Sequence, residues 1–189
     1  MDRAAVFVDA GYVFAEGSKL IAGQKLTRSQ LLLSYDDLLQ LLLNATAALT
    51  GLPLLRVYWY DGASVGPSPA QLAVSYRPNV KLRLGLVNEA GQQGVDELIA
   101  RDLVTLSQNR GMADALLLTG DDDIRPALEQ AQDHGVRVHL LGIAPTRQNQ
   151  AAALLQAADS CRELTEPEVR GFLSKRGHDG PSGMGSKGA

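Results

Sequence analysis

The chain has 189 residues, of which 45% are hydrophobic and 21% are charged, the usual balance of a globular domain. Its net charge of −3 argues against binding nucleic acid through bulk charge, although a local basic groove beside an acidic site is compatible with it. The single cysteine, Cys161, excludes an intramolecular disulfide, and no apolar run is long enough to cross a bilayer. Residues 1–8 do not resemble a secretory leader, so we expect a cytoplasmic protein with no membrane association.

The first part of the chain alternates between a short strand, a helix and a second strand. Residues 4–8 are all apolar and are followed by Asp9, which predicts a strand buried on both faces. The leucine-rich stretch 29–50 predicts a helix. Residues 54–60 are rich in aromatic and β-branched side chains and predict the second strand, and the glycines and prolines of residues 61–69 predict a loop.

The same alternation continues through the second part of the chain. Residues 80–86 alternate between apolar and polar side chains, which predicts a half-exposed strand. A helix is predicted to begin at Asp96, with its apolar side chains on one face. The remaining predicted elements are strands over residues 115–119, 136–141 and 161–164, and helices over residues 124–134 and 148–158.

Regular alternation of strands and helices is typical of a parallel sheet, because each crossover helix must return the chain to the same edge and cover a face of the sheet. We therefore expect a single α/β domain with a mostly parallel central sheet and helices on both faces. The expected boundaries are residues 1–165 for the domain, 166–176 for a helical extension and 177–189 for a disordered tail rich in glycine and serine.

Acidic residues follow the predicted strands at the edge where open parallel sheets bind their ligands. Asp9 ends the first strand, and Asp96 starts a helix. Three consecutive acids, Asp121, Asp122 and Asp123, follow a later buried strand after a single glycine. Helix capping is an alternative role for Asp96 and for one acid of this run. Three adjacent carboxylates exceed that need, and their mutual repulsion costs energy unless a cation offsets it.

Oxygen ligands without a cysteine cluster or a histidine pair favour Mg²⁺ or Mn²⁺ over zinc. The histidines His134, His139 and His178 lack ligand spacing, and we expect them at the surface or in the tail. A carboxylate-held cation of this kind suits phosphodiester hydrolysis, because it lowers the pKa of an attacking water and stabilises charge on the departing oxygen. No Walker A motif and no G-x-S-x-G motif occurs in the sequence.

The order and spacing of these motifs resemble the NYN (LabA-like) family of PIN-like ribonucleases. The similarity lies in residues 6–12 (Val-Phe-Val-Asp-Ala-Gly-Tyr), 57–62 (Val-Tyr-Trp-Tyr-Asp-Gly), 94–96 (Gly-Val-Asp), 101–103 (Arg-Asp-Leu), 118–123 (Leu-Thr-Gly-Asp-Asp-Asp) and 135–142 (Gly-Val-Arg-Val-His-Leu-Leu-Gly), and it covers about residues 3–165. The resemblance implies a PIN-like Rossmannoid fold, a divalent cation, and cleavage of single-stranded or structured RNA.

The acidic positions of the family fall on four residues of this chain, Asp9, Asp96, Asp121 and Asp123, which the resemblance implies as catalytic residues and as ligands of Mg²⁺ or Mn²⁺. Asp102 matches a further acid but lies about 240° around the helix from Asp96, and Asp122 falls where the family has a small residue. Both are therefore less favoured ligands.

Departures from the family pattern at Gly11 and Gln93 favour an alternative function, a catalytically weak or inactive module that binds RNA or a protein. Many relatives have an asparagine where this chain has Gly11-Tyr12, a lysine at the position of Gln93, and an aromatic residue at the position of Ile124. A small-molecule phosphatase is a third hypothesis, but the Asp-x-Asp-x-Thr motif is absent at Asp9.

Basic and aromatic side chains that could contact RNA are spread along the sequence. The basic candidates are Arg56, Arg77, Lys81, Arg83, Arg101, Arg110 and Arg125. One of the three aromatics in residues 58–60 could stack on a base, although at least one must be in the core. The leucines of residues 31–43 could form a homodimer contact, with a plain core helix as the alternative.

Overall fold

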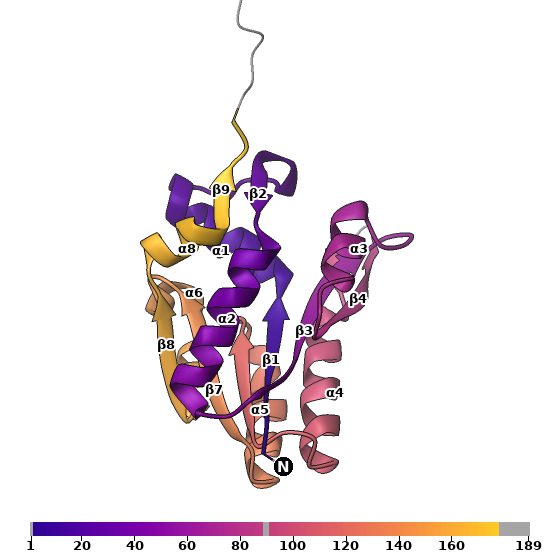
Figure 1. Ribbon diagram of the computed structural model, residues 1–189, viewed down its shortest axis with the longest axis vertical. Helices are drawn as coiled ribbons and strands as arrows, with labels where there is room; N and C mark the ends of the chain where they lie inside the picture. The colour runs from indigo at the N-terminus through magenta and orange to yellow at the C-terminus, as the bar shows by residue number, and fades with distance from the viewer. Residues whose placement is uncertain (1, 89–90, 178–189) are drawn as a thin grey trace, which may run out of the picture.

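Seven strands form the central sheet, in the order β5-β4-β3-β1-β6-β7-β8 (Figure 1). The computed structural model describes residues 2–88 and 91–177. The strands of this sheet are β1 (Ala4–Asp9), β3 (Leu54–Ala63), β4 (Val80–Asn88), β5 (Gly91–Gln93), β6 (Asp114–Leu118), β7 (Arg137–Ile143) and β8 (Ser160–Leu164). All neighbouring pairs are parallel except β4 and β5. The predicted α/β fold with a mostly parallel sheet is confirmed.

Helices cover both faces of this sheet, as Figure 1 shows for α2 in front of β1 and α5 behind it. The helices are α1 (Ala10–Ala22), α2 (Tyr35–Thr50), α3 (Pro69–Ser75), α4 (Val95–Gln108), α5 (Arg125–Asp133), α6 (Thr146–Asn149), α7 (Ala152–Ala157) and α8 (Glu166–Phe172), with short 3₁₀ turns η1 (Arg28–Gln30) and η2 (Asp122–Ile124). None of the helices in the described ranges has the length and hydrophobicity needed to span a membrane.

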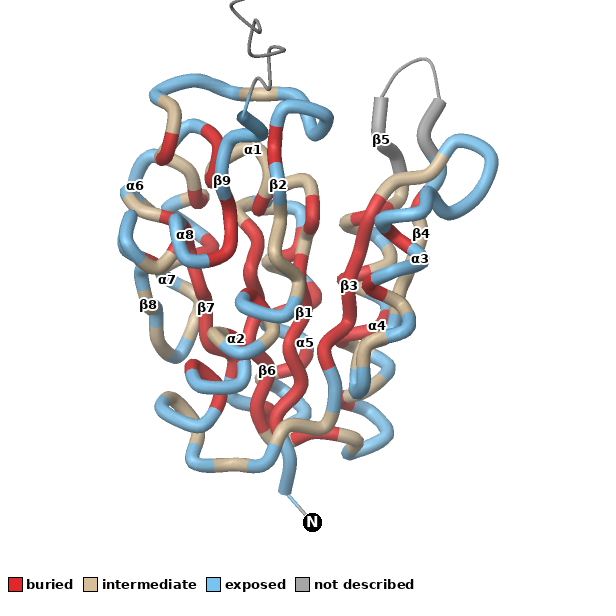
Figure 2. Tube along the Cα trace, turned by 45° about the horizontal axis from the view of Figure 1, so that its top comes forward, coloured by how far each residue is buried: buried red, intermediate tan, exposed pale blue. Residues whose placement is uncertain are grey.

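The alternation of side chains along β1 gives each face of the sheet its own core. Ala4, Val6 and Val8 pack with apolar residues of α1, α2 and α8. Ala5 and Phe7 pack on the opposite face, with residues of α4, α5 and α7. Figure 2 shows this burial along the central strands. Because β1 is covered on both sides, its sequence is continuously apolar up to Asp9.

The order of the strands reverses beside β1, and this reversal determines where a ligand site can form. From β1 the chain moves outward through β3 and β4, and then returns to place β6 on the other side of β1. Open sheets bind ligands beyond the carboxyl ends of the strands at such a switch point. Asp9 ends β1, and the segment Thr119–Asp123 follows β6, so both lie at this point.

Helix α1 directly follows β1, and the sequence pattern does not predict it. Gly11 and Gly17 have low helix propensity, so the stability of α1 comes from packing side chains such as Val13 in the core. Gly17 also allows a close approach, because a Cβ added there would lie 2.5 Å from Cδ2 of Leu173. Tertiary contacts therefore decide the structure of this segment.

The helix predicted to begin at residue 29 begins at Tyr35, so its predicted start is wrong. The preceding residues form η1 and strand β2 (Leu31–Leu33), which pairs antiparallel with β9 (Leu173–Lys175). Ser34 then caps α2 by accepting the amide hydrogen of Asp37. The predicted extension over 166–176 is helical only as far as Phe172, since β9 follows α8 directly. The predicted disordered tail lies, from residue 178 on, outside the described residues.

Two other local predictions are corrected by long-range contacts. The helix predicted over residues 148–158 is divided into α6 and α7, because the Gln150 side chain turns inward and donates to the carbonyl oxygens of Thr119 and Leu141. His139, expected at the surface, is only 6% exposed and its Nε2 lies 2.8 Å from Oδ1 of the fully buried Asp114. His134 is exposed as predicted, and His178 lies outside the described residues.

Candidate functional site

The carboxyl edge of the sheet brings acidic residues from three segments together. Parallel pairing of β1 with β6 places the end of β1, at Asp9, beside the turn that leads to Asp121. Gly94 adopts a left-handed backbone conformation, with φ of 77°, immediately before α4. This turn places Asp96 in the first helical turn of α4, near the same edge. The Asp96 carboxylate is close enough to Asp9 to repel it, and it is repelled in turn by Asp121 and Asp123.

Asp9 is partly buried, and burial raises the pKa of its carboxyl group to about 6. The backbone amides of Tyr12 and Gly11 oppose this rise, whereas the carboxylates of Asp96 and Asp61 add to it. The Asp9 side chain makes no capping hydrogen bond to α1. The Asp9 carboxylate nevertheless lies near the first amides of α1, which favour its charged form.

Asp96 is also partly buried, and burial together with the carboxylates of Asp121 and Asp123 raises its pKa. These two acids are exposed. Oδ1 of Asp121 accepts the amide hydrogen of Asp123 at 3.0 Å, so Asp121 caps the turn η2, as the capping hypothesis expects. The same hydrogen bond fixes the backbone of Asp123 next to Asp121.

The two less favoured acids are each neutralised by arginine. Asp102 is buried, and its carboxylate lies 2.8 Å from Nε of Arg83 and 3.2 Å from Nη2 of Arg101. It also accepts a hydrogen bond from the Tyr60 hydroxyl at 3.1 Å. Asp122 forms a longer ion pair, 3.4 Å from Nε of Arg125. The Asp102 charge is thus satisfied without a metal, whereas Oδ1 of Asp122 is buried without a hydrogen-bond partner among the described residues.

A cavity of about 480 Å³ opens beside the acids and is lined by Gly94, Asp96, Glu97, Ala100 and Asp123. In the described part of the chain, no three His, Cys, Asp or Glu side chains are grouped closely enough to hold a metal ion by themselves. Mg²⁺ is commonly held by one or two carboxylates together with waters and substrate phosphate oxygens. Among the described residues, the carboxylates of the four predicted ligands have no basic partner and repel one another. Such oxygen donors suit a cation of this kind.

A hydrogen-bond network beside the acids fixes the turn after β6. The Tyr12 hydroxyl accepts the amide hydrogen of Ile143 at 3.0 Å and donates to Oδ1 of Asn149 at 2.7 Å. Gly120 fits against this network, since a Cβ there would collide with the Asn149 carbonyl oxygen and the Tyr12 ring. Asn149 is not among the predicted site residues, because no local pattern distinguishes it from other polar residues of that segment.

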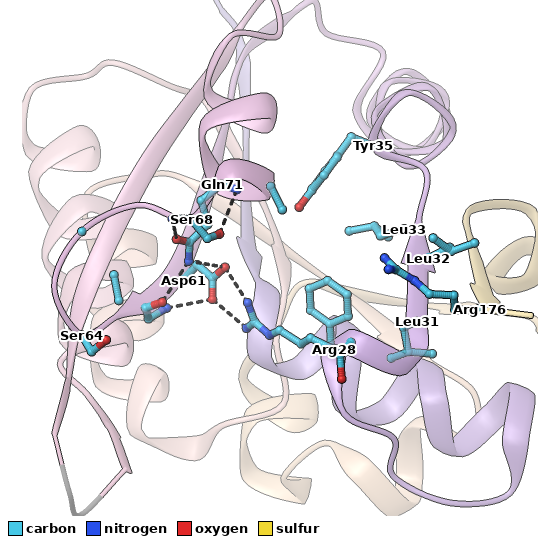
Figure 3. A pocket seen from close by; sticks show the side chains of 16 residues that line it. Arg28, Leu31, Leu32, Leu33, Tyr35, Asp61, Ser64, Ser68, Gln71 and Arg176 are labelled. Carbon is cyan, nitrogen blue, oxygen red and sulfur yellow. Dashed lines mark hydrogen bonds and ion pairs between the residues drawn. The ribbon is translucent and has the colours of Figure 1, made fainter. Parts of the chain in front are cut away.

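A second, larger cavity, of about 620 Å³, lies at the same edge of the sheet beyond the end of β3 (Figure 3). Asp61 lies in its wall and forms a bidentate ion pair with Arg28, at 2.6 and 2.7 Å. A loop is predicted over residues 61–69, but β3 extends to Ala63, and the sequence patterns do not identify Asp61 as a site residue. The available signal is its position at the end of a strand, the same signal that identifies Asp9.

Most of the basic side chains suggested for RNA contact are engaged with acids. Ion pairs to acids are formed by Arg77, Arg83, Arg101 and Arg125, whereas Arg56, Lys81 and Arg110 are exposed. The aromatic residues Tyr58, Trp59 and Tyr60 are all buried, and Tyr58 and Tyr60 stack with Phe7. The suggested stacking of one of these three rings on a base is therefore not supported.

The strand order and the carboxylates at the switch point define an open-sheet α/β protein with an acidic candidate site. Residues 3–165 match the NYN domain, and the chain belongs to this family of PIN-like nuclease domains, as the motifs indicated. Members generally use divalent metals and associate with RNA. An uncharacterized protein, y4oD, of Sinorhizobium fredii is 46% identical over 110 residues, which are 58% of this chain and 51% of the relative. The chain thus matches about half the length of that relative.

Proposed function

We propose that the protein hydrolyses RNA phosphodiester bonds with Mg²⁺ or Mn²⁺ bound by Asp9, Asp96, Asp121 and Asp123. The observation that carries this proposal is a contrast among the acids at the carboxyl edge of the sheet. In the described ranges, Asp61, Asp102 and Asp122 each form an ion pair with arginine, whereas the four proposed ligands form none. Burial and neighbouring carboxylates raise the pKa of Asp9 and of Asp96, and a bound cation would offset this cost.

Each acid has a distinct part in this proposal. Asp9 supplies a charge rigidly fixed at the end of a buried strand, and Asp96 supplies a second from the start of α4. Asp121 orients η2 through its bond to the amide of Asp123, and so positions the Asp123 carboxylate. These carboxylates would hold a divalent cation, which would supply an acidified water and stabilisation of the charge on the departing oxygen.

The alternative, a catalytically weak or inactive module that binds RNA or a protein, is favoured by the spacing of the acids. In the described ranges they do not form a closed group of three, so metal affinity depends on the contribution of the substrate phosphate. The replacement of the usual lysine by Gln93 also removes a positive charge that could contact the phosphate. Both hypotheses share the same fold, and they differ in whether the acidic edge cleaves RNA.

Cleavage of a labelled single-stranded RNA separates the two hypotheses. Wild-type protein with Mn²⁺ or Mg²⁺ should cleave, and Asp9→Asn and Asp123→Asn should reduce the rate at least about 100-fold while RNA affinity in EDTA is unchanged or slightly higher. The matched control is Asp133→Asn, an exposed acid at the end of α5. Cleavage that persists in EDTA, or no cleavage by wild type with either metal, contradicts the proposal.

A further inference from the structure

The cavity at the end of β3 has two chemically different walls (Figure 3). One wall contains β2, with Leu31 and Leu33, and the ring of Tyr35 at the start of α2. The other wall contains Asp61 and polar side chains such as Ser68 and Gln71. The cavity is therefore apolar and aromatic on one side and polar on the other, which is typical of a ligand pocket.

Arg28 spans the two walls and is held in a fixed orientation. Its guanidinium forms two hydrogen bonds with Asp61, and its carbon Cζ lies 4.6 Å from the centre of the Phe14 ring. Asp61 is further satisfied by Nε2 of Gln71 and by the amide of Gly62, each at 2.8 Å. The Asp61 carboxylate is thus hydrogen-bonded by groups of the protein itself. The Arg28 side chain, by contrast, is still 42% exposed to solvent. A guanidinium on so exposed a side chain can present its planar group to a ligand.

Aromatic and basic groups surround the remaining space. Tyr35 contacts Trp59 edge to face, with ring centres 5.5 Å apart, so that its ring is held in place while it lines the cavity. Arg176 lies on the same side as β2 and is exposed at the rim. A planar base fits between aromatic and guanidinium surfaces, and an attached phosphate fits an exposed arginine.

The cavity lies next to the proposed catalytic acids. Asp9 is paired in register with Tyr60, and Asp61 is the next residue of β3. Neighbouring strands are roughly 4.8 Å apart, so the wall of the cavity and the end of β1 are within the reach of one nucleotide. The Asp61 carboxylate also adds to the negative potential at Asp9, which agrees with this proximity.

We propose that this cavity binds one unpaired nucleotide of an RNA strand, with the base against Tyr35 and Arg28 and a phosphate near Arg176. A nucleotide bound in this way directs the backbone past Asp9, toward the acidic edge. The cavity volume of about 620 Å³ is large enough for one nucleotide. A base can lie between Tyr35 and Arg28 only when it is unpaired and unstacked, so the preferred substrate is single-stranded. The identification of the ligand as RNA rests on the proposed function.

The test measures binding in EDTA, so that it does not depend on cleavage. Fluorescence anisotropy is recorded with a labelled single-stranded RNA and with the same strand containing abasic positions. Tyr35→Leu should weaken binding of the intact strand about 10-fold and leave abasic binding unchanged. The matched control is Tyr76→Leu, since Tyr76 is 79% exposed and does not line the cavity. Arg176→Ala should lower the salt slope of binding by about 0.7, and Arg170→Ala on α8 is its control.

A measurement on wild type keeps the test valid if Tyr35→Leu does not fold. Wild type should bind the intact strand about 10-fold more tightly than the abasic strand, and photo-crosslinking of 5-iodouridine RNA should label Tyr35. Equal binding of intact and abasic strands, or equal losses for Tyr35→Leu and Tyr76→Leu, overturns the proposal. If Tyr35→Leu cleaves RNA at the wild-type rate, only this inference is overturned. If wild type binds RNA in a base-dependent way but does not cleave it with metal, only the proposed function is overturned.

Discussion

Asp9 couples the stability of the fold to pH, because its carboxyl group is partly buried at the end of β1. Burial raises its pKa from 3.8 to about 6, so the folded protein binds a proton more tightly than the unfolded chain does. The stabilising effect of that proton is fully present below pH 3.8 and is lost as pH rises toward 6. At pH 7 the charged carboxylate therefore lowers the free energy of unfolding.

Asp9→Asn should therefore raise the free energy of unfolding at pH 7 by about 1–3 kcal/mol, the range that a pKa rise of this size allows after solvent screening. Urea unfolding at pH 4 and pH 7, without metal, measures the effect. The gain should disappear at pH 4, where wild-type Asp9 is protonated. Asp133→Asn provides the control at an exposed position. A variant that is less stable than wild type at pH 7 would show that the Asp9 charge is compensated in the folded state.

At the scale of elements, the small sheet of β2 and β9 connects two segments that are far apart in the sequence. Leu31, Leu32 and Leu33 pair with Lys175, Ser174 and Leu173. Leu173 is 1% exposed and packs against Gly17 of α1, whereas Ser174 is exposed. The C-terminal segment thus anchors β2, which forms one wall of the cavity at the end of β3.

Leu173→Ala should lower the free energy of unfolding by about 2–4 kcal/mol, because it removes buried methyl groups and leaves a cavity beside Gly17. Ser174→Ala, one residue further along β9, should change it by less than about 0.5 kcal/mol. Chemical denaturation of the three proteins compares them. If the two variants were equally stable, β9 would not be packed as the structure shows.

Most leucines of helix α2 are explained by packing in the core of one chain and do not require a dimer. Leu38 and Leu42 are fully buried against the sheet, and Leu39 and Leu41 pack partly against the same core. Leu43, which is 43% exposed, is the main apolar side chain that α2 leaves in contact with solvent. The structure therefore supports the core-helix interpretation of this segment, and the homodimer stays a hypothesis.

For the whole molecule, a bound cation should stabilise the fold, because the proposed ligands come from three separate segments that only folding brings together. With a dissociation constant of about 1 mM, 10 mM Mn²⁺ or Mg²⁺ adds about 1.4 kcal/mol, or roughly 3–6 °C in melting temperature. Thermal scans with and without metal at pH 7 measure the shift. Asp121→Asn should abolish it.

Asp102→Asn is the matched control for this experiment. Asp102 is neutralised by Arg83 and Arg101, so its replacement should lower stability but keep the metal-dependent shift. Loss of the shift in Asp102→Asn would place this residue in the metal site. An unchanged shift in Asp121→Asn would remove that residue from it.

Sequence patterns determine those features of the protein that depend on local order. The continuous apolar run of residues 4–8 is fully buried only in a strand that is covered on both faces. Alternation of strands with helices makes the sheet parallel. In a parallel sheet all carboxyl ends lie at one edge, so the positions of Asp9 and Asp121 after their strands already predict that they approach one another.

Only the tertiary structure decides the features that depend on partners distant in the sequence. Residues 31–33 become a strand because residues 173–175 pair with them, and α1 is helical because its apolar face is buried. The same dependence explains why Asp61 is overlooked: its partner Arg28 is 33 residues away, and no local pattern predicts their ion pair. Local sequence specifies periodicity and polarity, whereas burial and charge pairing are set by neighbours that only folding supplies.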